Sequence, residues 1–234
     1  MPRRAVEGQV LRRIAAICAT GADDRALRHE VLEQVSRCVP FDAHAWLMTD
    51  PETSVGSSPL ADVPFLAELP TLVGLKYRTG LPERYGCWGF LDLWRVAPGL
   101  PFAPDEVRFL GQLGPMVTAA LRHAQASTLS TRRRAGAVPG PVVLLLSPRL
   151  EVRARTPQTD RYLERLVPPR EGARAVPAGS YNVAAQLLAV ETGVDGNPPR
   201  ARVHLGDDVW LTTSAARIPH EHRHRNRTSP SPSS

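Results

Sequence analysis

The chain has 234 residues, of which 42% are hydrophobic, and a formal net charge of +6. This length holds one or two domains with enough apolar residues to bury a core. No apolar run reaches the length of a membrane-spanning helix, and the N-terminus lacks the apolar region of a secretory signal. We therefore expect a cytoplasmic protein without a membrane partner.

The positive charge is almost all arginine, because Lys76 is the only lysine among 29 basic residues. Four arginines and one glutamate lie between Arg217 and the end of the chain, so about half of the net charge is in this segment. The rest of the chain is only mildly basic. The three cysteines, at positions 18, 38 and 87, are widely spaced and predict neither a disulfide framework nor a cysteine zinc site.

Two helices open the chain. The first carries apolar residues at helical spacing and ends at Thr20-Gly21; its stripe is Val10, Leu11, Ile14, Ile17 and Cys18. The second begins at Asp23 or Asp24 and ends before Pro40; its stripe is Leu27, Val31, Leu32 and Val35.

Strands and a short helix follow. Residues 43–50 predict a strand, 51–58 a loop, and 64–75 a short helix. Residues 86–96, GCWGFLDLWRV, give the strongest strand signal. One face would carry Trp88, Phe90, Asp92 and Trp94 and the other Leu91 and Leu93, and a strand that is apolar on both faces is expected in the centre of a sheet.

A long helix and a linker follow, and beyond the linker the pattern of strands and helices restarts. Residues 102–126 predict a long helix that Pro115 kinks; its stripe is Val107, Leu110, Val117, Ala120, Leu121 and Ala124. An Arg/Gly/Pro linker follows at 130–141. Beyond it we expect a hairpin, a helix starting near Thr156, a second helix ending at Gly193, and a hairpin that turns at Gly206-Asp207. The fold class is therefore α+β, in two modules.

Three segments before the linker share one resemblance: VPFDAHAWLMTDPETSVGSSPLADVPFLAELP, GCWGFLDLWR and PFAPDEVRFLGQL. Two segments after it share it too: GPVVLLLSPRLEVRARTPQTDRYL and RVHLGDDVWLTTSAAR. All five resemble the sensor region of actinobacterial LuxR-type helix-turn-helix transcriptional regulators, the first three its GAF-like domain and the last two its PAS-like module. The resemblance implies a GAF-like domain at 1–129, the linker at 130–141 and a PAS-like antiparallel sheet with helices on one face at 142–218. A disordered basic, Ser/Pro-rich tail is expected at 219–234.

The sequence departs from this family in three places. Only residues 81–84 separate the segments that precede the strongest strand, so the GAF-like sheet is expected to be incomplete. The 17 residues after Arg217 are too few for a helix-turn-helix, so we expect no sequence-specific DNA binding by this chain alone. The strand that would complete the PAS-like sheet is also missing, which predicts an unpaired edge at residues 142–146.

Five residues are candidates for a ligand pocket: His44, Trp46, Trp88, Phe90 and Asp92. Alternation places the last three on one strand face, which His44 and Trp46 could join from a neighbouring strand. In one interpretation the aromatic side chains are core and Asp92 makes a structural hydrogen bond. In the other they line a small-molecule pocket in which Asp92 orients the ligand. We expect His44 to be a structural histidine and not a catalytic base.

The tail contains H-E-x-x-H at His220, Glu221 and His224, the spacing of a zinc metalloprotease site. That chemistry needs a helix, a third ligand and a walled pocket. No Asp, Glu or His follows His224, and serine and proline dominate the end of the chain. We therefore expect a solvated tail that binds metal weakly at most, with no catalytic residues and no cofactor.

The sequence favours a non-enzymatic sensory or regulatory protein, namely the ligand-sensing part of a LuxR-type regulator. Its expected partners are a small molecule and either a second copy, paired through the helices at 6–18 and 105–126, or a full-length relative. Two alternatives remain. A metal-dependent hydrolase would lose activity when His220 and His224 are replaced, and a decayed fragment without function would show poor solubility and non-cooperative melting.

Overall fold

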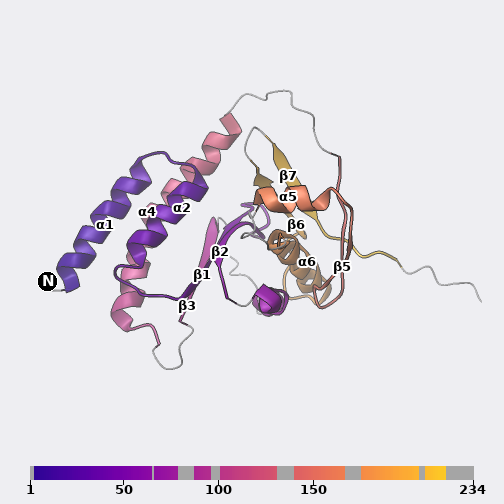
Figure 1. The fold of residues 1–234 in the computed structure, drawn as a ribbon, viewed down its shortest axis with the longest axis horizontal. Helices are drawn as coiled ribbons and strands as arrows, with labels where there is room; N and C mark the ends of the chain where they lie inside the picture. Colours follow the sequence, from indigo (N-terminus) through magenta and orange to yellow (C-terminus); the bar gives the residue numbers. More distant parts are fainter. Residues whose placement is uncertain are drawn as a thin grey trace, which may run out of the picture.

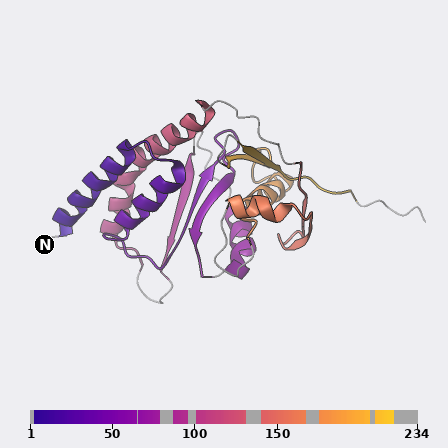
Figure 2. The same cartoon turned by 45° about the horizontal axis from the view of Figure 1, so that its top comes forward.

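The computed structural model describes residues 3–64, 66–78, 87–95, 101–130, 140–166, 175–205 and 209–219. Over these ranges the chain is an α+β protein with six α-helices and three small antiparallel sheets, which confirms the predicted fold class. The largest sheet stands in the middle of the molecule, with a layer of helices on each side (Figures 1 and 2). No helix in these ranges is long and apolar enough to cross a membrane.

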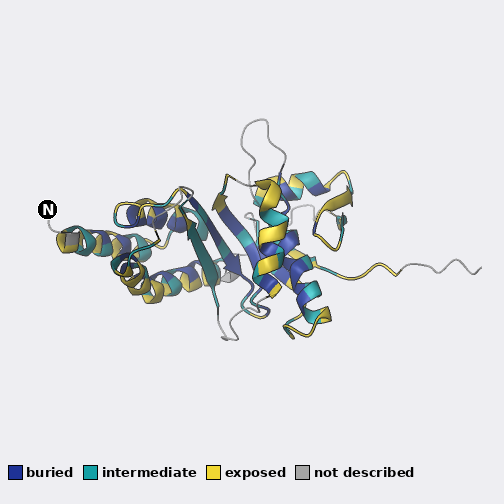
Figure 3. Cartoon of the chain, turned by 90° about the horizontal axis from the view of Figure 1, so that it is seen from below, coloured by how far each residue is buried: buried dark blue, intermediate teal, exposed yellow. Residues whose placement is uncertain are grey.

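The central sheet has three antiparallel strands in the order β2-β1-β3. They are β1 (Ala43–Thr49), β2 (Gly56–Asp62) and β3 (Gly89–Trp94). Trp46 of β1 lies opposite Leu60 of β2 and Leu91 of β3, so these three side chains share one face. Figure 3 shows that the strands are mostly buried or half-buried, whereas the helices on either side expose their outer surfaces.

Two expectations about this sheet were wrong. The strand predicted to be central, β3, is an edge strand among the described residues, and β1 takes the central position. The segment 51–58 was predicted as a loop, yet its last residues, from Gly56 onward, belong to β2. Its Gly, Ser and Pro content hides this strand, because pairing with β1 and burial, and not β-propensity, hold it in place.

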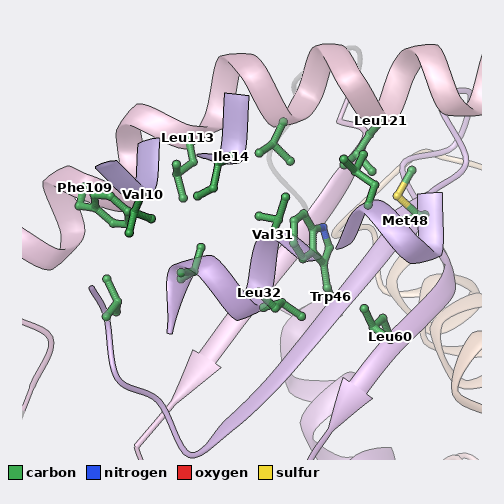
Figure 4. Close-up of a cluster of buried hydrophobic side chains, with 14 residues drawn as sticks. Val10, Ile14, Val31, Leu32, Trp46, Met48, Leu60, Phe109, Leu113 and Leu121 are labelled. Atoms are coloured by element: carbon green, nitrogen blue, oxygen red, sulfur yellow. The ribbon is translucent and has the colours of Figure 1, made fainter. Parts of the chain in front are cut away.

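One face of the sheet is covered by α1 (Arg3–Ala19), α2 (Asp24–Val35) and α4 (Pro104–Ser130). Asp23 caps α2, as expected, since its carboxylate accepts hydrogen bonds at 2.9 Å from the backbone N–H groups of Arg25 and Ala26. Figure 4 shows the core between helices and sheet, which includes Val10, Ile14, Val31, Trp46, Leu113 and Leu121.

The predicted stripe of α4 was partly wrong. Val107, assigned to it, is 57% exposed, whereas Phe109 and Leu113 are buried in the core. Pro115 lies inside α4, which continues through it to Ser130.

Arg28 of α2 is a charged side chain inside this core. Its guanidinium is 0% exposed and ion-pairs with Asp24 at 2.6 Å. It also donates to the backbone oxygens of Trp46 at 3.0 Å and Ser58 at 2.8 Å. One side chain thus ties α2 to two strands and satisfies carbonyl groups that would otherwise lie buried without a partner.

The other face of the sheet is covered by α3 (Leu69–Arg78), which follows a short 3₁₀ turn (Leu66–Glu68), and by α6 (Ala178–Glu191). Two glycines let α6 approach β2 closely. A Cβ atom on Gly179 would come within 2.9 Å of the backbone oxygen of Ser57, and one on Gly56 would meet Leu47 at 2.7 Å. At Gly179 a larger residue therefore requires a shift of the backbone, whereas at Gly56 the nearest atom belongs to the movable side chain of Leu47.

The remaining elements are β4 (Leu144–Leu146), β5 (Val152–Arg155), α5 (Thr159–Leu166), β6 (Arg200–His204) and β7 (Trp210–Ser214). The two expected hairpins are present, but the expected single PAS-like sheet is not. Within the described residues β4 pairs only with β5, and β6 pairs only with β7.

Residues from the two sides of the predicted linker are joined by a buried carboxylate. The side chain of Asp50, directly after β1, is 0% exposed. It accepts hydrogen bonds from the backbone N–H of Arg202, from its Nε at 2.9 Å and from its Nη2 at 3.2 Å. Thr53 donates to the backbone oxygen of Arg200 at 2.7 Å nearby. The two halves thus pack into one body, and the domain boundaries themselves stay a prediction.

We predict that Asp50→Asn destabilises the protein. The amide keeps the shape of the side chain but loses the charge-assisted bonds to Arg202, which costs about 2 kcal/mol of the free energy of unfolding. Urea denaturation followed by circular dichroism measures this loss. The matched control is Glu52→Gln, because Glu52 is 56% exposed and its pairs with Arg200 and Arg202 contribute less than about 1 kcal/mol.

The effect of Asp50→Asn also depends on pH. Burial alone would raise the pKa of Asp50, but the hydrogen bonds from Arg202 and Glu52 outweigh it and lower the pKa below its usual value. This stabilisation is therefore complete above the unfolded-state pKa, about 3.9, and is lost as the pH falls through the lower folded-state pKa. Equal losses for the variant and its control at neutral pH would contradict the assignment.

Candidate functional site

A pocket of about 660 Å³ lies between β3, α2 and α4. We call it the β3–α4 pocket. Its lining combines Val31 and Val35 from α2, Trp46 from β1, and Leu113, Val117 and Leu121 from α4. Figure 4 shows several of these side chains pointing into the space between the sheet and α4. Its volume is within the range of small-molecule sites, which is about 300–1,000 Å³.

The pocket runs along the outer edge of β3. Its lining includes Leu91 and Leu93 from one strand face and also Asp92 and Trp94 from the other. A pocket that touches both faces of one strand must lie at the strand's edge. Because β3 has a hydrogen-bonded neighbour on one side only among the described strands, backbone polar groups on its other side face this space.

Helix α4 lies across the pocket from β3, and two contacts show that the two elements run in opposite directions. Near the start of α4, Arg95 after β3 pairs with Glu106 at 2.7 Å. Sixteen residues later, the Arg122 guanidinium lies 5.3 Å from the ring centroid of Trp88, just before β3. The two contacts therefore mark opposite ends of the pocket.

An arginine stacks on an aromatic ring at each end. Arg95 lies 4.4 Å from the ring centroid of Phe102 and also donates to the backbone oxygens of Pro40 and Pro101. Arg122, in contrast, is exposed and makes no ion pair with any residue that the structure describes. Both stacks are cation–π contacts, which hold the rings in place.

The structure divides the five candidate residues between the two faces of the sheet. His44 and Trp46 are two residues apart on β1 and share one face of the sheet, as expected. This face, however, is the one that α2 and α4 cover. Phe90 lies on the opposite face, in a cluster with Val73 and Tyr77 of α3. The expectation that His44 and Trp46 join the wall formed by Phe90 and Asp92 was therefore wrong.

Trp88 also departs from the expected alternation. It precedes β3, which begins at Gly89, and its ring meets Arg122 of α4 rather than the side of α3. Of the five candidates, Trp46, Trp88 and Asp92 line the β3–α4 pocket, and His44 and Phe90 do not.

Asp92 has a partner within the protein. Its carboxylate pairs with Lys76 of α3 at 2.7 Å, and the same ammonium lies 4.5 Å above the ring of Phe90. The ion pair holds Asp92 on the α3 side of the strand and neutralises its charge. Asp92 therefore presents no unpaired carboxylate to the pocket.

His44 has a structural environment. Its ring meets that of Phe41 edge-on at 5.8 Å between centroids. Burial lowers its pKa, and the nearby Asp62 only partly offsets this, so the ring is neutral at physiological pH. These contacts support the interpretation of His44 as a structural residue.

Sequence reasoning missed most of the pocket lining, including Phe102 and Thr118, and also Arg122 beside it. Thr118 and Arg122 are one turn apart on α4, so they lie on the same side of the helix. The available signal was the interruption of the apolar stripe of α4 by Gly114 and Thr118, which leaves space beside the core. The stacking of Arg122 on Trp88 had no signal in the sequence.

The metal hypothesis concerns residues outside those described. His220, Glu221 and His224 all lie there. Among the described residues, no group of three or more His, Cys, Asp or Glu side chains is placed to hold a metal ion.

Comparison with known proteins identifies no relative: no family model, no curated protein and no solved structure matches the chain.

Cys87 lines the pocket and gives a test of its environment. Burial raises the pKa of the Cys87 thiol, although its hydrogen bond to Gly89 and the charge of Lys76 partly oppose this. At pH 8 less thiolate is present than in the unfolded chain. We predict that iodoacetamide alkylates Cys87 about tenfold more slowly in the native protein than in urea.

The alkylation experiment uses a chain in which Cys18 and Cys38 are replaced by serine, with mass spectrometry as the readout. N-acetylcysteine, measured with and without urea, corrects for the effect of urea on the reaction itself. Equal native and unfolded rates would show that Cys87 is freely exposed.

Proposed function

We propose that this chain is a non-enzymatic signal-sensing module that binds a small, mainly apolar molecule in the β3–α4 pocket. The observation that carries the proposal is the pocket itself, about 660 Å³ in volume and lined mainly by aromatic and aliphatic side chains. Sites of this kind are typical of small-molecule binding.

The position of the pocket in the chain supports the proposal. Its lining residues fall between Val31 and Leu121, inside the segment 1–129 that resembles the GAF-like domain of LuxR-type regulators. In that family this domain is the sensory part, which motivates a regulatory role. The buried sides of α1, α2 and α4 face the sheet, so the proposal assigns no DNA-reading role to them.

The partner of this module stays a prediction. A second copy of the chain or a full-length regulator that receives the signal would fit the expected role. The tail hydrolase stays an alternative without an observation in its favour among the described residues.

Tryptophan fluorescence provides a native readout. Three of the four tryptophans, Trp46, Trp88 and Trp94, line the pocket, and the fourth, Trp210, is in β7. We expect a neutral apolar probe, N-phenyl-1-naphthylamine, to bind saturably, to quench the tryptophan emission and to gain fluorescence of its own.

We predict that Thr118→Phe blocks this binding. Thr118 is half-buried in the pocket wall, and a phenyl group there fills space that the probe needs, which weakens binding by about tenfold or more. The matched control is Ala119→Phe, which adds the same side chain at the next position of α4, where the residue is exposed and outside the lining. Equal affinities for the two variants, or no saturable binding by the wild type, would refute the proposal.

A further inference from the structure

We infer that the natural ligand of the β3–α4 pocket has an aromatic body and a single carboxylate, and that the carboxylate lies against Arg122. This inference rests on the proposed function, because it names the chemical class that the same pocket accepts. Three features support it: the aromatic and branched side chains of the pocket walls, the pairing of most charged groups around them, and the position of Arg122.

The walls favour a flat apolar group. Trp46, Trp88 and Phe102 contribute rings, and Leu113 and Val117 of α4 contribute branched side chains. Arginines also lie over the rings of Trp88, at 5.3 Å, and Phe102, at 4.4 Å from the centroid. An aromatic ligand packs against such rings in offset or edge-on geometry and gains more than the area alone provides.

Most charges around the pocket are already paired. Asp92 in the lining is bound to Lys76 at 2.7 Å. Arg95 at the Phe102 end is bound to Glu106 at 2.7 Å and to two backbone oxygens. Within the part of the chain that the structure describes, neither end of the pocket therefore offers an unpaired carboxylate to a cationic ligand.

Arg122 is the exception. Its guanidinium lies over Trp88, which lines the pocket, and is one helical turn from Thr118 in the same wall. It is exposed and has no acidic partner among the described residues, so its N–H groups remain available. A ligand seated on Trp88 would bring its end group close to these donors.

A carboxylate suits this position better than other anions. The planar guanidinium donates two parallel hydrogen bonds to a carboxylate. A phosphate monoester would also accept from the guanidinium, but its second negative charge would find no further cation in the lining, where Arg122 is the nearest unpaired one among the described residues. Because Arg122 is exposed, the gain is modest and falls as salt screens the pair.

The test compares two probes with the same naphthalene body, the anionic 2-naphthoate and the neutral 2-naphthalenemethanol, by isothermal titration of the full chain at low salt. We expect the wild type to bind 2-naphthoate about fivefold more tightly than the alcohol. Arg122→Gln should bring the two affinities within about twofold of each other, chiefly by weakening naphthoate binding. The control Arg108→Gln removes an exposed arginine of the same helix, which pairs with Asp105 at 2.8 Å, and should keep the preference.

The outcomes separate this inference from the proposed function. Equal binding of the two probes by the wild type, or a preference for naphthoate that survives Arg122→Gln, would overturn the carboxylate assignment while the pocket stands. Failure of both naphthalene probes and of N-phenyl-1-naphthylamine would overturn the pocket and the assignment together. A preference that disappears in Arg122→Gln, persists in Arg108→Gln and declines with added salt supports the assignment.

Discussion

The structure depends on one constraint: strand β1 buries side chains on both of its faces. Trp46 and Met48 point to one side and Ala45 and Thr49 to the other, and all four are buried. Such a strand needs a covering layer on each side. The first half of the chain supplies one layer with α1, α2 and α4, and α6, from beyond the predicted linker, contributes to the other. The bond between Asp50 and Arg202 fixes β6, and with it the second layer, directly at the end of β1.

The β3–α4 pocket follows from the same arrangement. The sheet ends at β3 among the described strands, and α4 lines the space at that edge with residues between Leu110 and Leu121. Apolar side chains that a further strand would otherwise cover therefore line an open space. The arginines stacked at its two ends give the pocket a polar rim, and the side chains between them give it a mainly apolar interior. This combination is usual for sites that bind small molecules.

Much of the local structure could be predicted from the sequence, because apolar stripes and caps report on a segment's own contacts. The cap at Asp23, the strand at β1 and the helix end before Gly193, whose φ is +72°, are examples. The strand β2 was missed because Ser57 and Ser58 carry no hydrophobic signal. The order of strands was also mistaken, since an apolar strand such as β3 can be covered on both faces and still lie at an edge.

The site was predicted only in part for a similar reason. Alternation assigns residues to faces within one strand, so Phe90 and Asp92 were correctly separated from Leu91 and Leu93. It does not extend to Trp88, which lies outside the strand, and it does not relate the faces of two strands, which need the register between β1 and β3. Arg122 is far from Trp88 in sequence, and only the packing of α4 brings them together.

The approach of α6 to β2 restricts how this chain can change over time. Ser57 presents a backbone oxygen to Gly179, and a backbone atom cannot rotate aside as a side-chain terminus can. Even a methyl group at position 179 would push the helix outward and loosen every contact beneath it. The residue allowed at position 179, in the half after the linker, is thus restricted by a backbone atom of β2, in the half before it.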